Sequence, residues 1–526
     1  MLTATRPHPA AEAVPTPTLT DRLRSTVASS PDAEALVDGD TRLTWDELMT
    51  RAESFAAGLR ERGIAAGDVV LIQLPNWWEA VIAVWGTWLA GGVVLPVVPI
   101  YRARELTFII DQVDPAAVVA PQSYRGHDHA AELRDLAPDR LVVGVRTVGA
   151  MSGVVPFDDV AGPAVSPHAP VSPDDIALVL YTSGTTSAPK GALHSHRTLL
   201  AESGSIVDVC RLSDVDRVFM PSPLSHITGL SYAIVLPADV GAAAVLLDRW
   251  DPEVAVDLVE RERCTFTVSA TPFLRGLTDV YASRPDSSSA LQTFVCGGAD
   301  IPPDLVRRAH AVMGTAVVRT YGSTEMPTLA MADPFGDLDA AAAAEGEAIG
   351  RNEMVVRNDE NGAGELLARG PELFLGYVDA TLNEPSFTHD GWFRTGDVAS
   401  IDDGILRISG RIKDIINRGG EKYSAAEVEW ALLSHPWVAE IAIVGYPDDD
   451  LGERACAFVV PSTADVPTLG DLRAHLLAAG FAIQKSPERI KIVDVLPRTA
   501  SGKIQKFRLR EGLGWAALPT EVETRT

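Results

Sequence analysis

Cysteine is scarce in this sequence. The 526-residue chain has four cysteines, Cys210, Cys264, Cys296 and Cys456. No two of them have the CxxC spacing of structural zinc sites, and they are too few and too far apart for the disulfide framework of a small secreted domain. We therefore expect four reduced, buried thiols, and neither a structural zinc site nor a disulfide scaffold.

Long apolar runs are also missing, although 46% of the residues are hydrophobic. No stretch reaches the roughly 18 apolar residues that a membrane-spanning helix needs, so a membrane span is not expected. Residues 1–16 are rich in Pro, Thr and Ala and lack the apolar centre of a signal peptide. We expect them to form a flexible arm, residues 517–526 to form a flexible tail, and the protein to be cytoplasmic.

Positive charge is in deficit. The chain has 45 Lys and Arg residues against 71 Asp and Glu residues, which gives a formal net charge of −26. Such a surface repels nucleic acid and anionic membranes, so neither is an expected partner. It also repels phosphate-bearing ligands at long range. A site for such a ligand must therefore be locally basic or rich in backbone N–H groups.

Strands and helices alternate along most of the chain. The apolar spacing predicts helices at residues 43–62 and 79–90 and a buried strand at residues 69–74. Further strands are predicted at residues 93–98, 175–181, 242–247, 265–270 and 293–298. Repeated units of this kind imply layered parallel sheets covered by helices, so the expected fold class is α/β. A chain of this length exceeds one hydrophobic core and needs at least one further domain.

The pattern changes twice towards the C-terminus. Residues 346–376 are rich in Gly and Glu with short apolar runs, which predicts a small β subdomain. Beyond residues 410–420 the sequence predicts a compact α+β domain of about a hundred residues. Its expected elements are helices at 425–435 and 469–480 and strands at 438–447, 454–461 and 489–496.

The most informative string is YTSGTTSAPKG, residues 181–191. An apolar strand runs directly into hydroxyl-bearing residues and glycine, whose freed backbone N–H groups can form an anion cradle, and Lys190 adds a positive charge. The string is not the P-loop pattern, because the lysine follows proline and precedes glycine. A Ser/Thr-rich surface turn would not explain the Pro–Lys–Gly ending. The candidate phosphate ligands are Thr182, Ser183, Gly184, Thr185, Thr186 and Lys190.

This string resembles the signature of the ANL superfamily of adenylate-forming enzymes, which comprises acyl-CoA synthetases, nonribosomal peptide synthetase adenylation domains and firefly-type luciferases. The family usually has glycine where this chain has Ser187. The resemblance implies ATP and Mg²⁺ as ligands and the formation of an acyl-AMP from an acid. Thr185 is among the residues to which it gives a catalytic role.

Further motifs of the family follow in order. VCGGAD resembles the segment under the adenine and contributes Gly297, Gly298 and Ala299. TYGSTE contributes Tyr321 and Gly322 at the adenine, Thr324 at the α-phosphate and Glu325 as the Mg²⁺ ligand. A carboxylate suits this role because Mg²⁺ prefers oxygen ligands and bridges phosphate oxygens. GWFRTGD contributes Asp397, expected to bind the ribose hydroxyls, and Arg411 follows as a ribose and phosphate ligand.

Two lysines complete the resemblance. Lys413 matches the hinge about which the small domain rotates. Lys503, in PRTASGKIQK, matches the catalytic lysine that bridges the attacking carboxylate and the α-phosphate. The predicted organisation is an ATP- and acid-binding domain at residues 17–411, a hinge at 412–414 and a mobile C-terminal domain at 415–516.

The resemblance also covers the acceptor. INRGGEKYSAAEVE, residues 416–429, resembles the loop that lines the channel for a pantetheine arm, with Gly419 and Gly420 leaving room for it. The family commonly has proline before the following helix, where this chain has two alanines. The expected acceptor is the thiol of coenzyme A, and a carrier protein remains an alternative.

The acid-binding segment resembles that of acyl-CoA synthetases, most closely cyclohexanecarboxylate and medium-chain acyl-CoA ligases, in PLSHITGLSY and LLDRWDP. His226 is a candidate pocket-gating and catalytic residue. Residues 227–235 contain no acid that could pair with a substrate ammonium, which favours a neutral carboxylic acid of medium size over an α-amino acid. The expected pocket residues are His226, Gly229, Leu230, Tyr232, Ser269, Ala270, Gly297, Gly322 and Met326.

Three other functions stay open. The adenylate could pass to a carrier protein or an amine. The acid could be another oxyacid, such as nitrite, activated for attack by an aryl amine in a diazotisation-type step of secondary metabolism. A catalytically idle scaffold is disfavoured because Lys190, Glu325, Asp397 and Lys503 are all present. The sequence does not define an oligomeric state.

Overall fold

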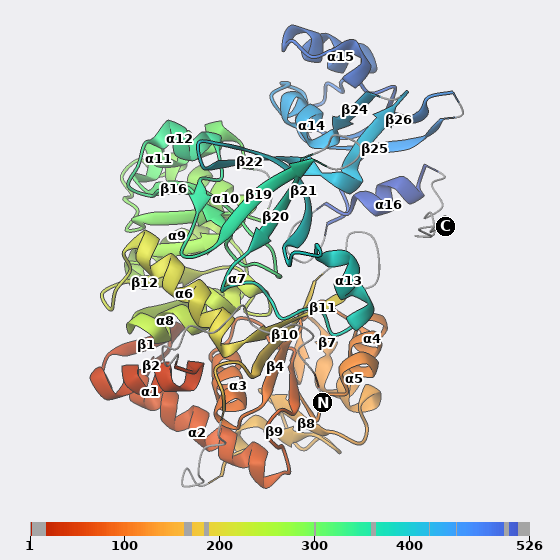
Figure 1. Cartoon of the computed structure of the whole chain (residues 1–526). Helices are drawn as coiled ribbons and strands as arrows, with labels where there is room; N and C mark the ends of the chain where they lie inside the picture. Colours follow the sequence, from red (N-terminus) through yellow and green to blue (C-terminus); the bar gives the residue numbers. More distant parts are fainter. Residues whose placement is uncertain are drawn as a thin grey trace.

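Two large sheets form the body of the molecule in the computed structural model (Figure 1), which describes residues 2, 17–162, 171–182, 189–298, 301–358, 364–419, 421–448, 450–498 and 504–513. Within these residues the first sheet has nine strands, in the order β18-β17-β16-β15-β14-β12-β13-β1-β2. Its strands are β18 (Glu347–Ala348), β17 (Ala330–Met331), β16 (Ala316–Tyr321), β15 (Thr293–Cys296), β14 (Phe266–Ser269), β12 (Arg217–Met220), β13 (Ala243–Leu246), β1 (Glu34–Asp38) and β2 (Thr41–Thr44). The six strands from β16 to β1 are parallel, as the strand–helix alternation predicts.

The second sheet has seven strands among the described residues, in the order β11-β10-β4-β3-β5-β8-β9. They are β11 (Lys190–Ser195), β10 (Ile176–Thr182), β4 (Val93–Pro96), β3 (Val69–Ile72), β5 (Ala117–Pro121), β8 (Leu141–Val145) and β9 (Val155–Pro156). All neighbours are parallel except β10 and β11. A small hairpin, β6 (Ser123–Tyr124) and β7 (His127–Asp128), follows β5.

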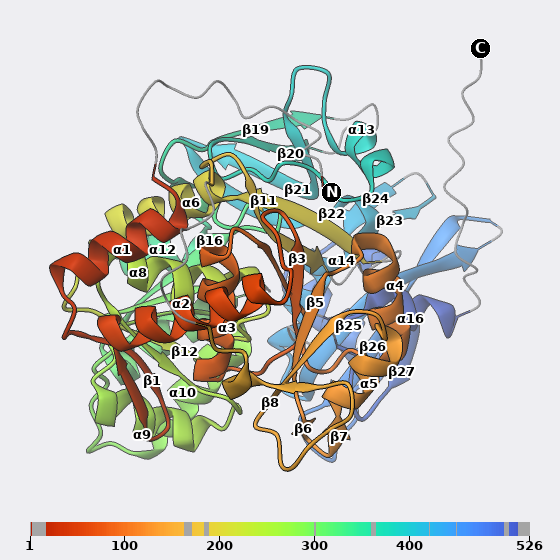
Figure 2. The same ribbon diagram turned by 90° about the horizontal axis from the view of Figure 1, so that it is seen from below.

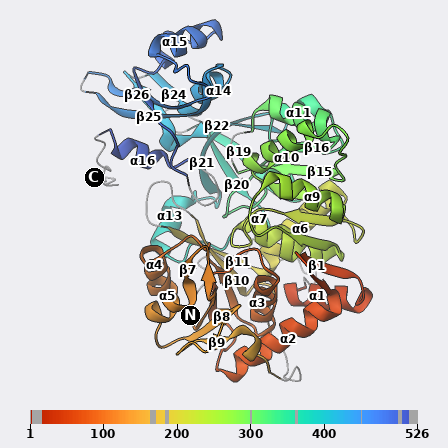
Figure 3. The same ribbon diagram turned by 180° about the vertical axis from the view of Figure 1, so that it is seen from behind.

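Helices cover both sheets and fill the space between them. The body contains α1 (Leu19–Ser29), α2 (Trp45–Glu61), α3 (Trp78–Leu89), α4 (Ala103–Val113), α5 (His129–Leu136), η1 (Phe157–Asp159), α6 (His196–Cys210), α7 (Ile227–Leu230), η2 (Ser231–Val235), α8 (Leu236–Val240), α9 (Pro252–Glu262), α10 (Thr271–Ser283), α11 (Pro303–Met313) and α12 (Leu338–Ala343). The view from behind shows α9, α10 and α11 on the outer face of the nine-stranded sheet (Figure 3). From below, α4 and α5 lie on the outer side of the seven-stranded sheet (Figure 2).

Helix α3 is apolar on all sides because it lies in the core between the sheets. Trp85 and Trp88 are almost completely buried, and the indole of Trp88 donates to the carbonyl of Ala177 at 2.8 Å. The same hydrophobic cluster includes Val70 of one sheet and Val218 of the other. The two sheets therefore share one core.

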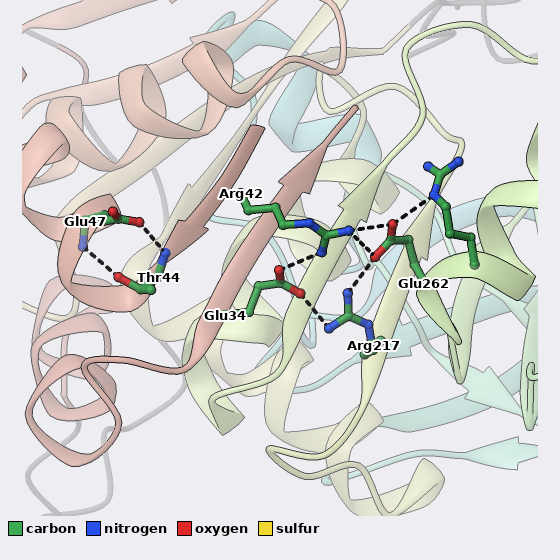
Figure 4. Close-up of polar contacts among 7 residues, drawn as sticks. Glu34, Arg42, Thr44, Glu47, Arg217 and Glu262 are labelled. Atoms are coloured by element: carbon green, nitrogen blue, oxygen red, sulfur yellow. Dashed lines mark hydrogen bonds and ion pairs between the residues drawn. The ribbon is translucent and has the colours of Figure 1, made fainter. Parts of the chain in front are cut away.

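Hydrogen-bonded arginines hold the β1–β2 hairpin to the rest of its sheet (Figure 4). Arg42 contacts Glu34 at 2.7 Å and Glu262 at 2.8 Å, and Arg217 contacts the same two carboxylates at 2.7 and 3.2 Å. Burial alone would raise the pKa of Glu262, but the hydrogen bonds from Arg42 and Arg261 outweigh it and hold that pKa below its usual range. The β1–β2 hairpin is thereby held to the rest of the nine-stranded sheet by ion pairs as well as by the backbone pairing of β1 with β13.

The small β subdomain is an antiparallel sheet of β19 (Glu353–Asn358), β20 (Gly364–Arg369), β21 (Phe393–Asp402) and β22 (Ile405–Arg411). Two short helical segments, η3 (Ala380–Leu382) and α13 (Asn383–Ser386), connect β20 to β21. Figure 1 shows this sheet between the two large sheets and the C-terminal part of the chain.

The C-terminal part is α+β, as predicted. It comprises η4 (Ile412–Asp414), β23 (Ile415–Arg418), β24 (Glu421–Ser424), α14 (Ala425–Leu433), β25 (Val438–Asp448), β26 (Gly452–Pro461), α15 (Leu469–Ala478), η5 (Ile483–Lys485), β27 (Arg489–Ile492) and α16 (Lys506–Glu511). Its sheet has the order β24-β23-β26-β25, with β27 paired to β26. Contact with the body includes the guanidinium of Arg319, 5.5 Å from the ring centroid of Trp430, and Ser424, which donates to the carbonyl of Ser409 at 2.6 Å.

The predicted α/β class and most predicted elements are confirmed, with local differences. The helix predicted from residue 43 begins at Trp45, because Thr44 and Glu47 form a reciprocal capping box (Figure 4). Residues 415–418 and 421–424 pair as antiparallel strands where a loop was expected. The four cysteines are free and buried, as expected, and burial raises the pKa of each thiol. In the described part of the chain, no helix is both long and apolar enough to cross a membrane.

Candidate active site

The phosphate-loop motif connects two antiparallel strands. Thr182 ends β10 and is paired with Lys190, the first residue of β11, so the intervening loop starts and ends at one place. A Cβ atom on Gly191 would lie 2.9 Å from the side chain of Val378 and 3.0 Å from the ring of Tyr181, so a larger residue would require one of these side chains to shift. The predicted ligands Ser183, Gly184, Thr185 and Thr186 lie outside the described residues.

Lys190 and Glu325 meet at the side chain of Tyr377. The hydroxyl of Tyr377 donates to Oε1 of Glu325 at 2.7 Å, and Nζ of Lys190 lies 5.2 Å from the centroid of the tyrosine ring. Burial raises the pKa of the Tyr377 hydroxyl, and the charge of Glu325 raises it further, so the phenol keeps its proton. The candidate metal ligand and the candidate phosphate ligand therefore share one neighbour.

The loop that carries Thr324 and Glu325 is fixed by two further contacts. Nε2 of His194 lies 2.7 Å from the carbonyl of Thr324, and the backbone N–H of Phe374 donates to the carbonyl of Glu325 at 2.9 Å. Burial lowers the pKa of His194 to about 4, so its ring is neutral at pH 7 and donates from Nε2. A Cβ atom on Gly322 would lie 1.8 Å from a backbone carbonyl, which excludes any larger residue.

Glu325 satisfies the requirement for one magnesium ligand. Mg²⁺ in nucleotide sites is held by one or two carboxylates and takes its other ligands from phosphates and water. The described residues contain no group of three or more His, Cys, Asp and Glu side chains placed to hold a metal ion. Mg²⁺ held by Glu325 would take its remaining ligands from a phosphorylated ligand and water.

The predicted nucleoside ligands come together at the edge of the small β subdomain. The hydroxyl of Tyr321 donates to one oxygen of the Asp397 carboxylate, and Nε of Arg411 lies 3.0 Å from the other. Asp397 and Arg411 are cross-strand partners in β21 and β22. Burial and the charge of Asp397 raise the pKa of Tyr321, so its hydroxyl is a donor at neutral pH.

The predicted adenine segment lies beside this cluster. Cys296 ends β15 and is paired in parallel with Arg319 of β16. Gly297 and Gly298, which follow β15, therefore lie beside Tyr321, which ends β16. A Cβ atom on Gly297 would lie 2.6 Å from the side chain of Thr320, and Gly298 has a φ of +79°. Ala299 lies outside the described residues.

The predicted acid-binding segment is anchored by Asn76, which the sequence reasoning did not identify. Its side-chain amide donates to the carbonyls of Ser222 at 2.9 Å and Leu247 at 3.1 Å, and its carbonyl accepts from the backbone of Leu224 at 2.8 Å. Asn76 follows β3 of the seven-stranded sheet, whereas its partners follow β12 and β13 of the nine-stranded sheet. The segment therefore lies where the carboxyl ends of strands from both sheets meet.

The remaining acid-pocket candidates have different environments. His226 is half-buried and precedes α7, which contains Gly229 and Leu230, while Ser269 ends β14 and Ala270 precedes α10. Met326 packs in the hydrophobic cluster of the small β subdomain.

Tyr232 belongs to a buried polar network that the sequence reasoning missed. Its hydroxyl contacts the carboxylate of Glu202 and lies 2.7 Å from the hydroxyl of Thr328. Glu372, buried nearby, accepts from Ser205 at 2.6 Å. Burial and the charge of Glu202 raise the pKa of Glu372 well above its usual value. The hydroxyl of Tyr232 is thus hydrogen-bonded within the core of the protein.

The predicted hinge lies directly beyond the nucleoside cluster. Lys413 is half-buried, and burial together with the charges of Arg411 and Arg510 lowers its pKa to about 8. Arg510 of α16 donates to the carbonyl of Lys413 at 3.2 Å and contacts the carboxylate of Asp414 at 2.7 Å. The helix that follows the predicted catalytic loop is therefore bonded to the hinge, although Lys503 itself lies outside the described residues.

The predicted thiol channel lies on the β23–β24 hairpin. Gly419 has a φ of +61° and its N–H donates to the carbonyl of Leu451 at 2.7 Å. Gly420 lies outside the described residues.

Known proteins share this arrangement over almost the whole chain. The chain is 33% identical over 515 residues to the medium-chain fatty-acid–CoA ligase of Escherichia coli K12, covering 94% of this chain and 90% of that protein. ATP-bound MatB from Rhodopseudomonas palustris superposes with a TM-score of 0.84 at 29% identity, covering 94% and 98% of the two chains. The amide bond synthetase McbA from Marinactinospora thermotolerans gives a TM-score of 0.83 at 28% identity, covering 94% and 99%.

Family profiles match both parts of the chain. The AMP-binding enzyme family matches residues 23–378, and the AMP-binding enzyme C-terminal domain matches residues 427–503. These matches agree with the motif order read from the sequence. The chain therefore belongs to the AMP-binding enzyme family, in the acyl-CoA synthetase branch of the adenylate-forming ANL superfamily.

Proposed function

We propose that this enzyme activates a neutral, medium-sized carboxylic acid with ATP, releases pyrophosphate, and transfers the acyl group from acyl-AMP to the thiol of coenzyme A. The observation that carries the proposal is the convergence of Tyr321, Asp397 and Arg411 at one point, beside the pair of Lys190 and Glu325 on Tyr377. The first three residues suit a nucleoside, and Lys190 and Glu325 suit its phosphates and their metal ion.

The nucleoside would bind at the strand ends. In the proposed pose the adenine lies against Tyr321 and the backbone of Gly297 and Gly298, where the absence of side chains permits close approach to a flat ring. The carboxylate of Asp397 accepts hydrogen bonds from the ribose hydroxyls, and Arg411 offers N–H donors to ribose and phosphate. A carboxylate accepts such bonds strongly because it is charged.

The triphosphate would lie over the loop between Thr182 and Lys190. The two residues that flank this loop, Thr182 and Lys190, are paired across β10 and β11. Thr324 would contact the α-phosphate, and Glu325 would hold Mg²⁺, which when bound neutralises charge on the phosphate oxygens. The acidic net charge of the chain makes this local positive charge necessary.

The first step is attack by the carboxylate oxygen of the acid on the α-phosphorus. The new O–P bond forms as the bond to pyrophosphate breaks, so two anions approach each other without a side-chain nucleophile. Lys503 would bridge them and lower the barrier electrostatically. Asn76 would contribute indirectly, because it fixes the segment that leads to His226.

The second step needs access for a thiol. We infer that rotation about residues 412–414, between a body at 17–411 and a C-terminal domain at 415–516, withdraws Lys503 and brings the hairpin of Gly419 and Gly420 to the adenylate. The thiol sulfur then attacks the acyl carbon, AMP leaves and the thiol loses its proton. Lys413 is well placed for this role because it directly follows the nucleoside cluster.

Two features support the proposed substrate class. Residues 227–235 contain no acid to pair with an ammonium group, and a buried unpaired ammonium is costly. The similarity to a medium-chain fatty-acid–CoA ligase points to the same kind of substrate. His226 would stand at the pocket entrance, with Ser269 and Ala270 along the wall.

A second candidate function is amide formation, in which an amine attacks the adenylate. The similarity to an amide bond synthetase over almost the whole chain favours it. Mass spectrometry of the products separates the two: enzyme, ATP and Mg²⁺ are incubated with a panel of acids and either coenzyme A or a set of amines. The proposal requires acyl-CoA and AMP in the coenzyme A reactions. Amides as the main products, with no thioester, would favour the second function.

A further inference from the structure

Tyr377 contacts two oppositely charged groups of the proposed ATP site. Its hydroxyl donates to Oε1 of Glu325 at 2.7 Å, and its ring centroid lies 5.2 Å from Nζ of Lys190. The sequence motifs assign roles to Glu325 and Lys190 but none to Tyr377. One side chain thus connects the metal-ligand candidate to the phosphate loop.

The position of Tyr377 is fixed from several directions. Its backbone N–H donates to Oδ1 of Asn383 at 2.8 Å, and its backbone forms a bridge to Ala192 of β11. The ring packs against Phe374 with centroids 4.8 Å apart, and only 3% of the residue is exposed. The hydroxyl therefore has little freedom to leave Glu325.

The same segment holds Glu325 by its backbone. The N–H of Phe374 donates to the backbone carbonyl of Glu325 at 2.9 Å. Tyr377, three residues later in the chain, donates to the side chain of Glu325. The hydrogen bond from the Tyr377 hydroxyl fixes the rotamer of a carboxylate that would otherwise rotate. Partners of metal ligands commonly act in this way, by orienting the ligand and setting its basicity.

The ring has a separate effect on Lys190. An aromatic face attracts an ammonium group within about 6 Å of its centroid, and the attraction strengthens when the pair is shielded from water. This contact depends on the ring and not on the hydroxyl. Removal of the hydroxyl and removal of the ring therefore test two different contacts.

We propose that Tyr377 is a positioning residue that orients Glu325 for a divalent cation and holds the ammonium of Lys190 over its ring, coupling the metal ligand to the phosphate loop. The proposal rests on the proposed function, because it assumes that ATP and Mg²⁺ bind here. Loss of Tyr377 should weaken the Mg²⁺-dependent binding of ATP without changing the acid pocket.

Calorimetric titration of the full-length enzyme with ATP, in Mg²⁺ and in EDTA, tests the hydroxyl. We expect Tyr377→Phe to lower the ATP affinity in Mg²⁺ by about tenfold, the lower end of the effect of such partners. In EDTA its affinity should stay within about twofold of wild type, since the ring is retained. Tyr281→Phe removes the same atom from a buried tyrosine in a different hydrophobic cluster and should change neither affinity.

Tyr377→Leu tests the ring. This variant should lose affinity in EDTA as well, because Lys190 loses its aromatic neighbour. If Tyr377→Phe binds ATP in Mg²⁺ as tightly as wild type does, or loses as much ATP affinity in EDTA as in Mg²⁺, the role at Glu325 is overturned. If Tyr377→Leu binds ATP in EDTA as tightly as wild type does, the role at Lys190 is overturned. Thermal melts show whether each variant is folded. A wild-type enzyme that binds MgATP but activates no acid would contradict the proposed function and leave the Tyr377 test intact.

Discussion

The hydroxyl of Tyr321 donates a hydrogen bond to the carboxylate of Asp397, 76 positions later in the chain. Tyr321 ends a strand of the nine-stranded sheet, whereas Asp397 lies in the small β subdomain. Arg411 contacts the other carboxylate oxygen at 3.0 Å. The contact between these layers thus creates the proposed nucleoside site.

Replacing Asp397 by Asn should weaken recognition of the ribose. An amide offers one acceptor oxygen in place of two charged ones, so we expect the KM for ATP to rise by about tenfold, in line with the loss of a hydrogen bond to a charged group. The preference of the enzyme for ATP over 2′-deoxy-ATP should shrink. Initial rates of pyrophosphate exchange with the two nucleotides measure both effects.

Asp390→Asn is the matched control. Asp390 is exposed and forms an ion pair with Arg357 at 2.6 Å, away from the proposed nucleoside ligands. This variant should keep the wild-type KM and nucleotide preference. An Asp397→Asn enzyme with an unchanged preference would remove Asp397 from the ribose site.

Glu372→Gln should remove a loss of stability that sets in as the pH rises. The folded state raises the pKa of Glu372 well above its usual 4.5, so the folded chain binds a proton that the unfolded chain releases as the pH rises. Stability is therefore lost above about pH 4.5, and glutamine, which cannot ionise, avoids that loss. Urea unfolding at pH 5, 7 and 8.5 should show a relative gain for the variant that grows with pH. A constant difference between the two proteins across this range would contradict the raised pKa of Glu372.

Three buried histidines should make the protein less stable in acid. Burial lowers the pKa values of His129, His194 and His196 to about 4, from a usual value of 6.5. The unfolded chain therefore binds more protons below pH 6.5, and the stability present above that pH is lost as the pH falls towards 4. The free energy of unfolding should decrease as the pH is lowered from 7.5 to 5.

The variant His196→Gln isolates one of these groups. Removal of one titrating histidine should reduce the slope in acid by about 1.4 kcal/mol per pH unit, the value for one proton. A slope equal to that of wild type would show that His196 is not held neutral.

The ion network at the β1–β2 hairpin should contribute measurably to stability. Glu262 is buried and accepts contacts from Arg42, Arg217 and Arg261. Glu262→Gln leaves these guanidinium groups without their common anion, so we expect a loss of about 1–3 kcal/mol in urea unfolding. Asp304→Asn, which removes an almost fully exposed partner of Arg307, should cost less than about 1 kcal/mol. Equal losses in the two variants would mean that burial of Glu262 adds nothing.

The fold and the ATP motifs could be predicted because both are local in sequence. Apolar runs of strand length gave β10 and β15, and the string around Tyr321 and Glu325 is continuous. The small departures came from local chemistry that periodicity does not report. Thr44 caps α2, so the helix begins two residues later than predicted, and β23 pairs with β24 where a loop was predicted.

The partners of the motif residues could not be predicted in the same way. Tyr377 lies in an apolar run that resembles an ordinary strand, and its contact with Glu325 depends on pairing with β11 through space. Glu202 and Glu372 are far apart in sequence, so the interaction between their carboxyl groups has no sequence signal. One hint was present: Glu202 lies at helical spacing between Leu199 and Ile206, on the buried face of α6.

The central claim is that this enzyme adenylates a carboxylic acid, and acid-dependent exchange of labelled pyrophosphate into ATP tests it most directly. We predict exchange with neutral medium-sized aliphatic, alicyclic or aryl acids, little exchange with α-amino acids or without acid, and loss of exchange in Lys503→Ala while ATP binding survives. Absence of exchange with every carboxylic acid, or exchange with nitrite alone, would contradict the account.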